Sequence, residues 1–309
     1  MKHIFPTLMV FFLLTGCSTP NAMAFFAIET STPVPSATAE PTVTPLATKT
    51  RTPQPAPTPI ELGQAVTATL SPTATATPAL TVKGPGSITC PILLYHHIQA
   101  ADVPNDYYVT PEKFRAQMQA LKDWGYTPIP ISLLVKAINF GAPLPDRPVV
   151  ISFDDGDTTV YTTAFPIMQE FGFVGVNYLV GNRLNIDGFI STAQVKELIA
   201  AGWEVGSHSM THADLAQSTE VGWELSQSKA DIEKALDVKV ETFAYPFGSQ
   251  SERILNKVSK VYTSGVGLGI FMDQKPDNIY YLWRRPVYYG ADMAAFASYV
   301  PWNTPPGQP

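Results

Sequence analysis

The chain has 309 residues and a net charge of −6, and 29 of its residues are proline. This length fits one or two domains, and the small acidic surplus argues against a general nucleic-acid binder, whose binding surface is basic. The only cysteines are Cys17 and Cys90, too few for a disulfide framework, so metal or acid–base chemistry is expected to use His, Asp and Glu.

The chain begins with the features of an export signal. A basic start is followed by an apolar run over residues 4–14, which is too short to span a bilayer but typical of a signal-peptide core. The run ends in Leu-Thr-Gly-Cys, which resembles the bacterial lipobox and implies cleavage before Cys17 and lipid attachment to its thiol. We therefore expect a lipoprotein signal peptide at residues 1–17 and an extracytoplasmic protein held at the membrane by lipid only. An ordinary signal peptide is the alternative.

A segment rich in Thr and Pro follows the predicted signal. From residue 18 the chain is mostly Thr, Pro, Ala and Ser, with few charges before Lys83. Proline biases the residue before it towards extended geometry, and the segment has too little apolar surface to offset the entropy of folding. We expect a disordered, semi-stiff tether over residues 18–86 and one folded domain over residues 87–309.

Apolar runs and helical patterns alternate through the folded part. Helices are expected at residues 110–125, where Thr110 precedes Pro111, at 191–202, where Ser191 is the cap, and at 220–236. Strands are expected at residues 92–95, 149–153, 174–180, 203–206, 242–245, 262–267 and 281–287. This alternation predicts a parallel α/β architecture.

Two adjacent carboxylates follow the strand expected at residues 149–153. The chain there reads Asp154-Asp155-Gly156. Two like charges so close together cannot both ionise cheaply when buried, and a bound cation would remove that difficulty. The alternative is a β-turn, for which Asp-Gly is a common sequence, so this motif alone leaves both interpretations open.

Histidines cluster after two other expected strands. His208 and His212 are four residues apart, so both imidazoles can point to one side in a helical turn. His96 and His97 follow the strand at residues 92–95, and this clustering argues against exposed loop histidines. Two histidines with one carboxylate and open positions describe a catalytic metal site. The donors favour Zn²⁺, with Co²⁺, Ni²⁺ or Fe²⁺ as alternatives.

Four motifs of the chain match the pattern of one known family. They are Ser-Phe-Asp-Asp-Gly at residues 152–156, His-Ser-Met-Thr-His at 208–212, Phe-Ala-Tyr-Pro-Phe-Gly at 243–248 and Leu-Tyr-His-His-Ile at 94–98. Together they resemble the polysaccharide deacetylases (carbohydrate esterase family 4, the NodB-type domain), and the last motif resembles a branch that includes poly-N-acetylglucosamine deacetylases. The resemblance implies a distorted (β/α)7 barrel with its active site at the carboxyl ends of the strands, where the expected strands also place all four motifs.

The resemblance also implies roles for individual residues. Asp155, His208 and His212 would bind the metal, and Asp154 would be the general base that takes a proton from the attacking water. The backbone N–H of Phe247 would stabilise the oxyanion that forms.

Two departures from the family pattern affect the remaining assignments. Ala244 stands where many relatives have the Arg that orients the base, and we expect Arg284 to replace it beside Asp154. Many relatives also have a late general-acid histidine, whereas no histidine follows His212 here. In the branch with the early Tyr-His element that element supplies the acid, so the resemblance assigns the acid to His96, with His97 as the weaker candidate.

Aromatic side chains near the motifs suit a carbohydrate substrate. Tyr245 and Trp283 are expected to contact sugar rings, although a place in the barrel core is the alternative for each.

These observations predict a metal-dependent hydrolase that removes N-acetyl groups from an N-acetylglucosamine polysaccharide, either exopolysaccharide or peptidoglycan. The alternatives are an O-acetyl esterase on glycans such as xylan and a non-catalytic carbohydrate-binding protein of the cell surface. A general base beside a metal argues against the last of these, because binding alone does not need one. Neither a protein partner nor nucleic acid is expected.

Overall fold

The computed structural model describes residues 79–101 and 104–308 of the chain. The predicted signal peptide, Cys17 and the tether up to residue 78 lie outside the described residues. Among the described helices, none combines the length and apolar character that crossing a membrane requires.

Seven parallel strands form a closed barrel. They run in the order β3 (Ile92–Tyr95), β14 (Leu282–Pro286), β12 (Ser264–Leu268), β11 (Thr242–Ala244), β10 (Glu204–Ser207), β9 (Val176–Leu179) and β8 (Pro148–Phe153). The barrel closes because β3 also pairs with β8, with Ile92 opposite Val150 and Tyr95 opposite Phe153. β6 (Thr127–Pro128) pairs with the first residues of β8. The prediction of a (β/α)7 barrel is confirmed, and each of the seven expected strands overlaps one barrel strand.

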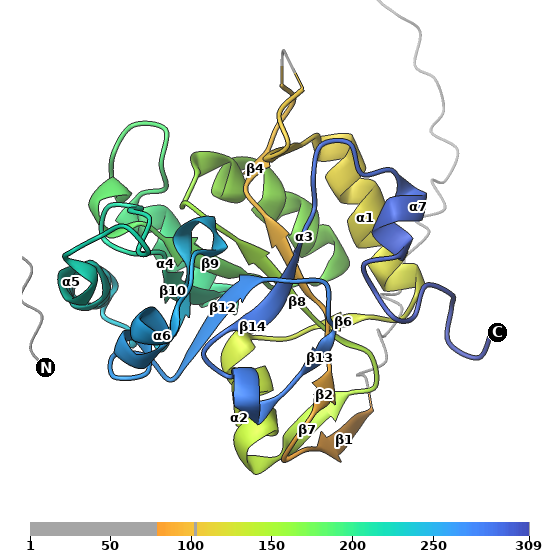
Figure 1. Cartoon of the computed structure of the whole chain (residues 1–309). Helices are drawn as coiled ribbons and strands as arrows, with labels where there is room; N and C mark the ends of the chain where they lie inside the picture. Colours follow the sequence, from red (N-terminus) through yellow and green to blue (C-terminus); the bar gives the residue numbers. More distant parts are fainter. Residues whose placement is uncertain (1–78, 102–103, 309) are drawn as a thin grey trace, which may run out of the picture. The chain divides into compact units, whose positions relative to one another are not determined.

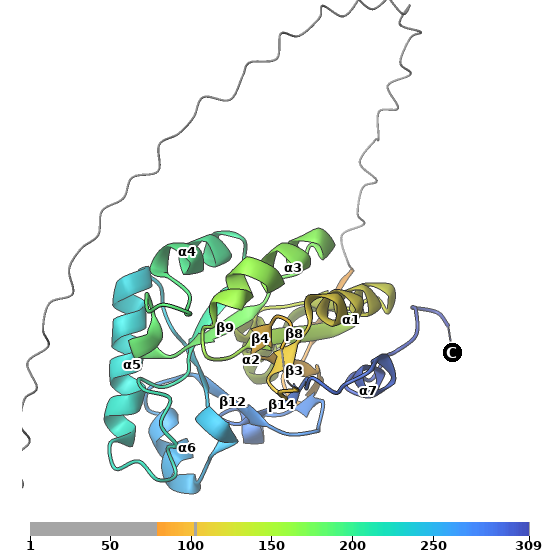
Figure 2. The same ribbon diagram turned by 90° about the horizontal axis from the view of Figure 1, so that it is seen from above.

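Helices surround the barrel, as the two views show (Figures 1 and 2). They are α1 (Pro111–Asp123), α2 (Ile131–Phe140), α3 (Phe165–Phe171), α4 (Thr192–Ala200), α5 (Val221–Leu236), α6 (Glu252–Val258) and α7 (Met293–Ala297). The predicted caps are present: the Thr110 side chain accepts from the Lys113 amide, and Ser191 forms a capping box with Gln194. These bonds satisfy amides that a helix leaves without partners at its first turn.

Alternate residues along each strand face the inside of the barrel and the surrounding helices. Ile92, Val150, Val266 and Leu282 belong to one buried cluster. Phe153 belongs to a second cluster on the helix side, where its ring stacks on Trp203 at 5.5 Å. Side chains that point inward at or just after the carboxyl ends of neighbouring strands therefore lie close together.

The folded part begins earlier than the sequence indicates, which corrects the predicted tether boundary at residue 86. β1 (Leu80–Lys83) pairs antiparallel with β7 (Ala142–Pro145). The side chains of Leu80 and Val82 are 58% and 74% exposed, so backbone pairing rather than apolar burial holds this strand in place. A pattern of buried apolar residues therefore does not indicate it in the sequence. Two further short strand pairs are β2 (Ile88–Thr89) with β13 (Asp273–Gln274), and β4 (His97–Ile98) with β5 (Tyr108–Val109).

Candidate functional site

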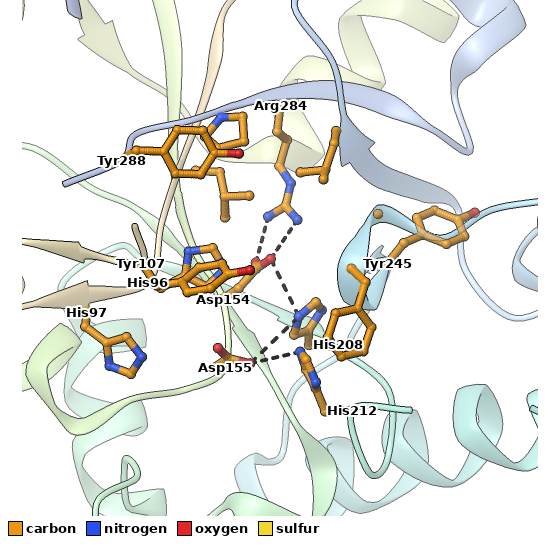
Figure 3. A pocket seen from close by; sticks show the side chains of 15 residues that line it. His96, His97, Tyr107, Asp154, Asp155, His208, His212, Tyr245, Arg284 and Tyr288 are labelled. Carbon is orange, nitrogen blue, oxygen red and sulfur yellow. Dashed lines mark hydrogen bonds and ion pairs between the residues drawn. The ribbon is translucent and has the colours of Figure 1, made fainter. Parts of the chain in front are cut away.

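One cavity of about 310 Å³ lies at the carboxyl ends of the barrel strands (Figure 3). Its walls bring together predicted site residues from four separate strand ends and from β14. They are His96, Asp154, Asp155, His208, His212, Tyr245, Phe247 and Arg284. Barrel closure explains the convergence, because residues up to about 190 positions apart in sequence follow neighbouring strands.

Asp155, His208 and His212 form a three-residue cluster suited to a metal ion, with ligand atoms all within 4.8 Å of one another. Asp155 Oδ1 lies 3.2 Å from His212 Nε2 and 3.9 Å from His208 Nε2. In a tetrahedral zinc site with bonds near 2.0–2.1 Å, neighbouring ligand atoms are about 3.3 Å apart. The donor set and its spacing therefore fit a divalent cation.

The surroundings of the two histidines favour the form that binds a metal. His208 Nδ1 lies 2.9 Å from the Ala244 carbonyl oxygen, so this nitrogen carries the proton and Nε2 presents its lone pair. Burial, with a further contribution from neighbouring His208, lowers the pKa of His212 to about 4. Both effects keep neutral imidazole available to a cation at neutral pH.

The backbone is strained at the site. Asp155, Ser209, His212 and Phe247 have φ between 59° and 71°, and they are four of the six non-glycine residues with positive φ in the described part of the chain. Such conformations cost free energy and persist where the surroundings impose them. Here, a hydrogen bond of 2.9 Å from the His212 amide to Ser209 Oγ helps to hold the loop that carries both histidines.

Asp154 is held by Arg284 rather than by the metal cluster. Arg284 Nη1 and Nη2 donate to the two carboxylate oxygens of Asp154 at 2.6 and 2.7 Å, and both side chains are almost fully buried. Burial would raise the pKa of Asp154, but the charge of Arg284, neighbouring His208 and the Arg284 hydrogen bonds outweigh it and hold this pKa well below its usual range. A charged, oriented carboxylate thus lies 3.6 Å from His208 Nε2. Arg284 lies beside Asp154, as predicted from the sequence.

His96 and His97 diverge after β3. The His96 ring lies beside Asp154 in Figure 3 and contacts the Tyr107 ring edge-on, with centroids 4.9 Å apart. Burial lowers the pKa of His96, and the charges of Asp154 and Asp155 oppose that effect. His97 turns away, with Nδ1 3.0 Å from Asp157 Oδ2 and its ring stacked on Tyr108.

The structure corrects one of the two expected sugar contacts. Trp283 does not line the cavity; its ring packs against Phe271 at 4.7 Å. The reason is strand alternation, since its neighbour Arg284 points into the barrel and Trp283 therefore points out. Tyr245 does line the cavity, but it is 1% exposed and its hydroxyl donates to the Tyr280 carbonyl.

Two charged residues near the cluster were missed by the sequence analysis. The carboxylate of Glu224 on α5 accepts from the amides of Met210 and Thr211, each at 2.9 Å, and from the Thr211 hydroxyl at 2.6 Å. Arg183 Nη1 lies 3.3 Å from Asp155 Oδ1. A glutamate at a buried helix position was the available signal for Glu224, which is 4% exposed.

Comparison with known proteins points to one family. A family model described as polysaccharide deacetylase matches residues 141–264. The chain is 28% identical over 216 residues to YxkH of Bacillus subtilis, across 68% of this chain and 75% of that protein. It is 25% identical over 213 residues to the poly-β-1,6-N-acetyl-D-glucosamine N-deacetylase of Staphylococcus epidermidis, across 59% of this chain and 72% of that protein. The crystal structure of a polysaccharide deacetylase from Bacillus cereus matches with a TM-score of 0.63 at 28% identity, across 69% of each chain.

Proposed function

Residues 141–264 match the polysaccharide deacetylase family, and from this premise we propose that the chain is a metal-dependent hydrolase that removes N-acetyl groups from a polysaccharide containing N-acetylglucosamine. The similarity to the Staphylococcus epidermidis enzyme supports the choice of an amide-linked acetyl group over an ester. Exopolysaccharide and peptidoglycan both carry this group.

The pairing of Asp154 with Arg284 is the observation on which the proposal chiefly depends. A ligand cluster for one cation has a second carboxylate beside it that the cluster does not use and that Arg284 keeps charged. A closed structural metal site has no need of such a group. Hydrolysis does need one, because water must lose a proton as it attacks the acetyl carbonyl.

The residues divide the proposed reaction between them. Asp154 takes the proton of the attacking water, and the Arg284 guanidinium keeps its carboxylate ionised and aimed at the cavity. The Phe247 backbone N–H is the proposed donor to the oxyanion. A divalent ion held by Asp155, His208 and His212 would supply Lewis-acid polarisation and lower the pKa of water.

Departure of the amine requires a proton donor, because an amide anion is too basic to leave. His96 is the proposed donor. It lines the cavity next to Asp154, on the opposite side from His212 (Figure 3). His97 is less suited to this role, since its Nδ1 faces Asp157 at 3.0 Å.

The proposal is tested by separating metal binding from turnover. Asp154→Asn is expected to retain about one divalent ion per chain while acetate release from N-acetylglucosamine oligomers falls by a factor on the order of 10² to 10⁴. His212→Ala is expected to lose both, because it removes a ligand. Asp123→Asn, at an exposed position of α1, is the matched control and should leave both unchanged.

Two results would count against the proposal. Full acetate release by Asp154→Asn would remove Asp154 from the role of base. Acetate release by the wild-type chain from acetylated xylan, with none from N-acetylglucosamine oligomers of any linkage, would favour an O-acetyl esterase. Comparing added Zn²⁺, Co²⁺ and Ni²⁺ in both assays identifies the ion that supports turnover.

We also propose that lipid on Cys17 anchors the domain at the cell surface, with residues 18–79 as the tether to the polysaccharide. The Leu-Thr-Gly-Cys sequence at residues 14–17 and the Thr/Pro-rich composition support this proposal. A labelled fatty acid should be incorporated into the wild-type chain and not into Cys17→Ser. Equal labelling of both would contradict it.

A further inference from the structure

The two walls of the cavity differ in character. Tyr107 and Tyr288 line it on the side of His96, and Phe247, whose ring contacts His212 edge-on with centroids 4.7 Å apart, lines it beside the metal cluster. In Figure 3 the two tyrosines and His96 lie to one side of Asp154, and His208 and His212 lie to the other. The pair Tyr107 and Tyr288 is called the tyrosine wall below.

The tyrosine wall is built from two segments that bond to each other. The Tyr289 amide donates to the Asp106 carbonyl at 3.2 Å, which links the loop after β14 to the turn before β5. The His97 amide donates to the Tyr107 carbonyl at 3.1 Å, and the Tyr107 amide donates to Asn105 Oδ1 at 3.0 Å. These bonds fix the backbone of Tyr107, so the wall does not depend on a single mobile loop.

Both rings of the wall are available to a ligand. Tyr107 is 52% exposed and Tyr288 is 44% exposed, whereas Tyr245 in the same cavity is buried. A tyrosine offers an apolar ring face together with a polar edge. That combination suits a pyranose ring, which presents C–H groups on its faces and hydroxyls around its rim.

The position of His96 indicates which part of the substrate lies against the tyrosine wall. The His96 ring touches the Tyr107 ring edge-on at 4.9 Å, and His96 is the proposed donor to the leaving amine. The sugar that carries this nitrogen must therefore lie on the side of the tyrosines, while the acetyl group lies towards the metal cluster. We infer that Tyr107 and Tyr288 form the subsite for the pyranose ring whose N-acetyl group is removed.

This inference rests on the proposed function and is tested on the full chain with two substrates. One is a β-linked N-acetylglucosamine oligomer, and the other is 4-nitrophenyl acetate, which has an acetyl group but no sugar. Two ratios are compared in each chain: kcat/KM for the oligomer divided by kcat/KM for the ester. This quotient should fall roughly 5- to 10-fold in Tyr107→Ala and in Tyr288→Ala, because each change removes a ring face that the sugar covers. In Tyr288→Ala the fall should come mainly from a higher KM for the oligomer.

Two further variants make the test specific. Tyr107→Phe and Tyr288→Phe keep the rings and should retain most of the wild-type ratio. Phe140→Ala removes an aromatic side chain that is 79% exposed at the end of α2 and does not line the cavity, and the ratio should stay at the wild-type value.

The outcomes separate this inference from the proposed function. An unchanged ratio in both alanine variants overturns the subsite. An equal fall in the alanine and phenylalanine variants supports the subsite and assigns the contact to the tyrosine hydroxyls instead of the ring faces. If the wild-type chain cleaves the ester but no N-acetylated oligomer, the proposed function fails and the subsite inference falls with it. Cleavage of the oligomer with an unchanged ratio removes the subsite alone.

Discussion

At the scale of single residues, the bidentate contact between Arg284 and Asp154 sets the charge of the proposed base. A buried carboxylate without a partner is expensive to ionise, and Asp154 is 2% exposed. Because Arg284 contributes two short hydrogen bonds as well as charge, it fixes both the ionisation and the orientation of the carboxylate.

Replacing Arg284 should change the pH dependence of turnover. The folded-state pKa of Asp154 is lowered, so this carboxylate stays ionised as the pH falls. Its contribution to stability is fully present at pH values above the unfolded pKa of about 3.9. In Arg284→Met the largest contribution that opposes burial is lost, so the pKa of Asp154 rises. The acid limb of kcat/KM should move to higher pH, with a loss of about 3–5 kcal/mol in the free energy of unfolding from the broken buried pair.

A pH–rate profile of the wild-type chain, Arg284→Met and Arg284→Lys checks this expectation. The lysine variant keeps the charge but loses the two-bond geometry, so its acid limb should lie nearer to that of the wild type. An acid limb at the same pH in all three chains would show that Arg284 does not control the ionisation of Asp154.

The residues of the site and the pairing of Asp154 with Arg284 could be predicted from the sequence, but the contacts that support the metal cluster could not. The motifs identified Asp154, Asp155, His208 and His212, and each lines the cavity. The contacts of Glu224 and Arg183 depend on where the barrel places elements that are distant in sequence, and no motif marks them. Trp283 shows the complementary limit, because proximity in sequence to Arg284 placed it near the site, whereas strand alternation turns it outwards.

At the scale of elements, α5 supports the loop that carries both histidine ligands. Glu224 accepts three hydrogen bonds from residues 210 and 211, between His208 and His212. Ser209 and His212 have positive φ, so this loop needs external contacts to keep its shape. The carboxylate is therefore a positioning residue for the metal cluster.

Glu224→Gln is expected to weaken metal binding by a factor of roughly 10 to 100, the usual cost of losing a partner that orients ligands. The glutamine oxygen can accept from the amides of Met210 and Thr211, but its nitrogen then faces the Thr211 hydroxyl. Loss of the negative charge weakens these bonds, and the loop would relax. Competition between the chain and a chelator of known affinity measures the effect without relying on activity. Glu220→Gln, at an exposed position just before α5, is the control. An unchanged metal affinity in Glu224→Gln would contradict the role.

The elements that could be predicted are those whose own residues are buried. Strands such as β3, β8 and β9 are buried along their whole length and therefore form apolar runs in the sequence, which is why they were found there. Caps at Thr110 and Ser191 marked two helix starts. β1 could not be found in this way, because its side chains face solvent and only its backbone pairs.

At the scale of the whole described domain, the residues proposed for catalysis and the strand pair β1–β7 lie towards opposite ends of the barrel. The cavity lies at the carboxyl ends of the strands, whereas β1 and β7 lie next to the start of β8, towards the opposite end (Figure 1). In barrels of this type, residues at the amino-terminal face contribute mainly to stability. Changes at β1 should therefore affect folding more than catalysis.

The boundary of the folded part gives a direct test of this separation. A chain that begins at residue 79 retains β1, and a chain that begins at residue 87 lacks it. The shorter chain also loses the bond from the Gly86 amide to the Ile138 carbonyl at 2.8 Å, and from Lys83 Nζ to the Asp146 carbonyl at 2.7 Å. We expect its free energy of unfolding to be lower by about 1–3 kcal/mol, with the same metal content and kcat.

Urea unfolding and acetate release measure the two properties. Equal stability of the two chains would mean that β1 adds nothing to the fold, and a fall in kcat would show that this strand is coupled to the site across the barrel.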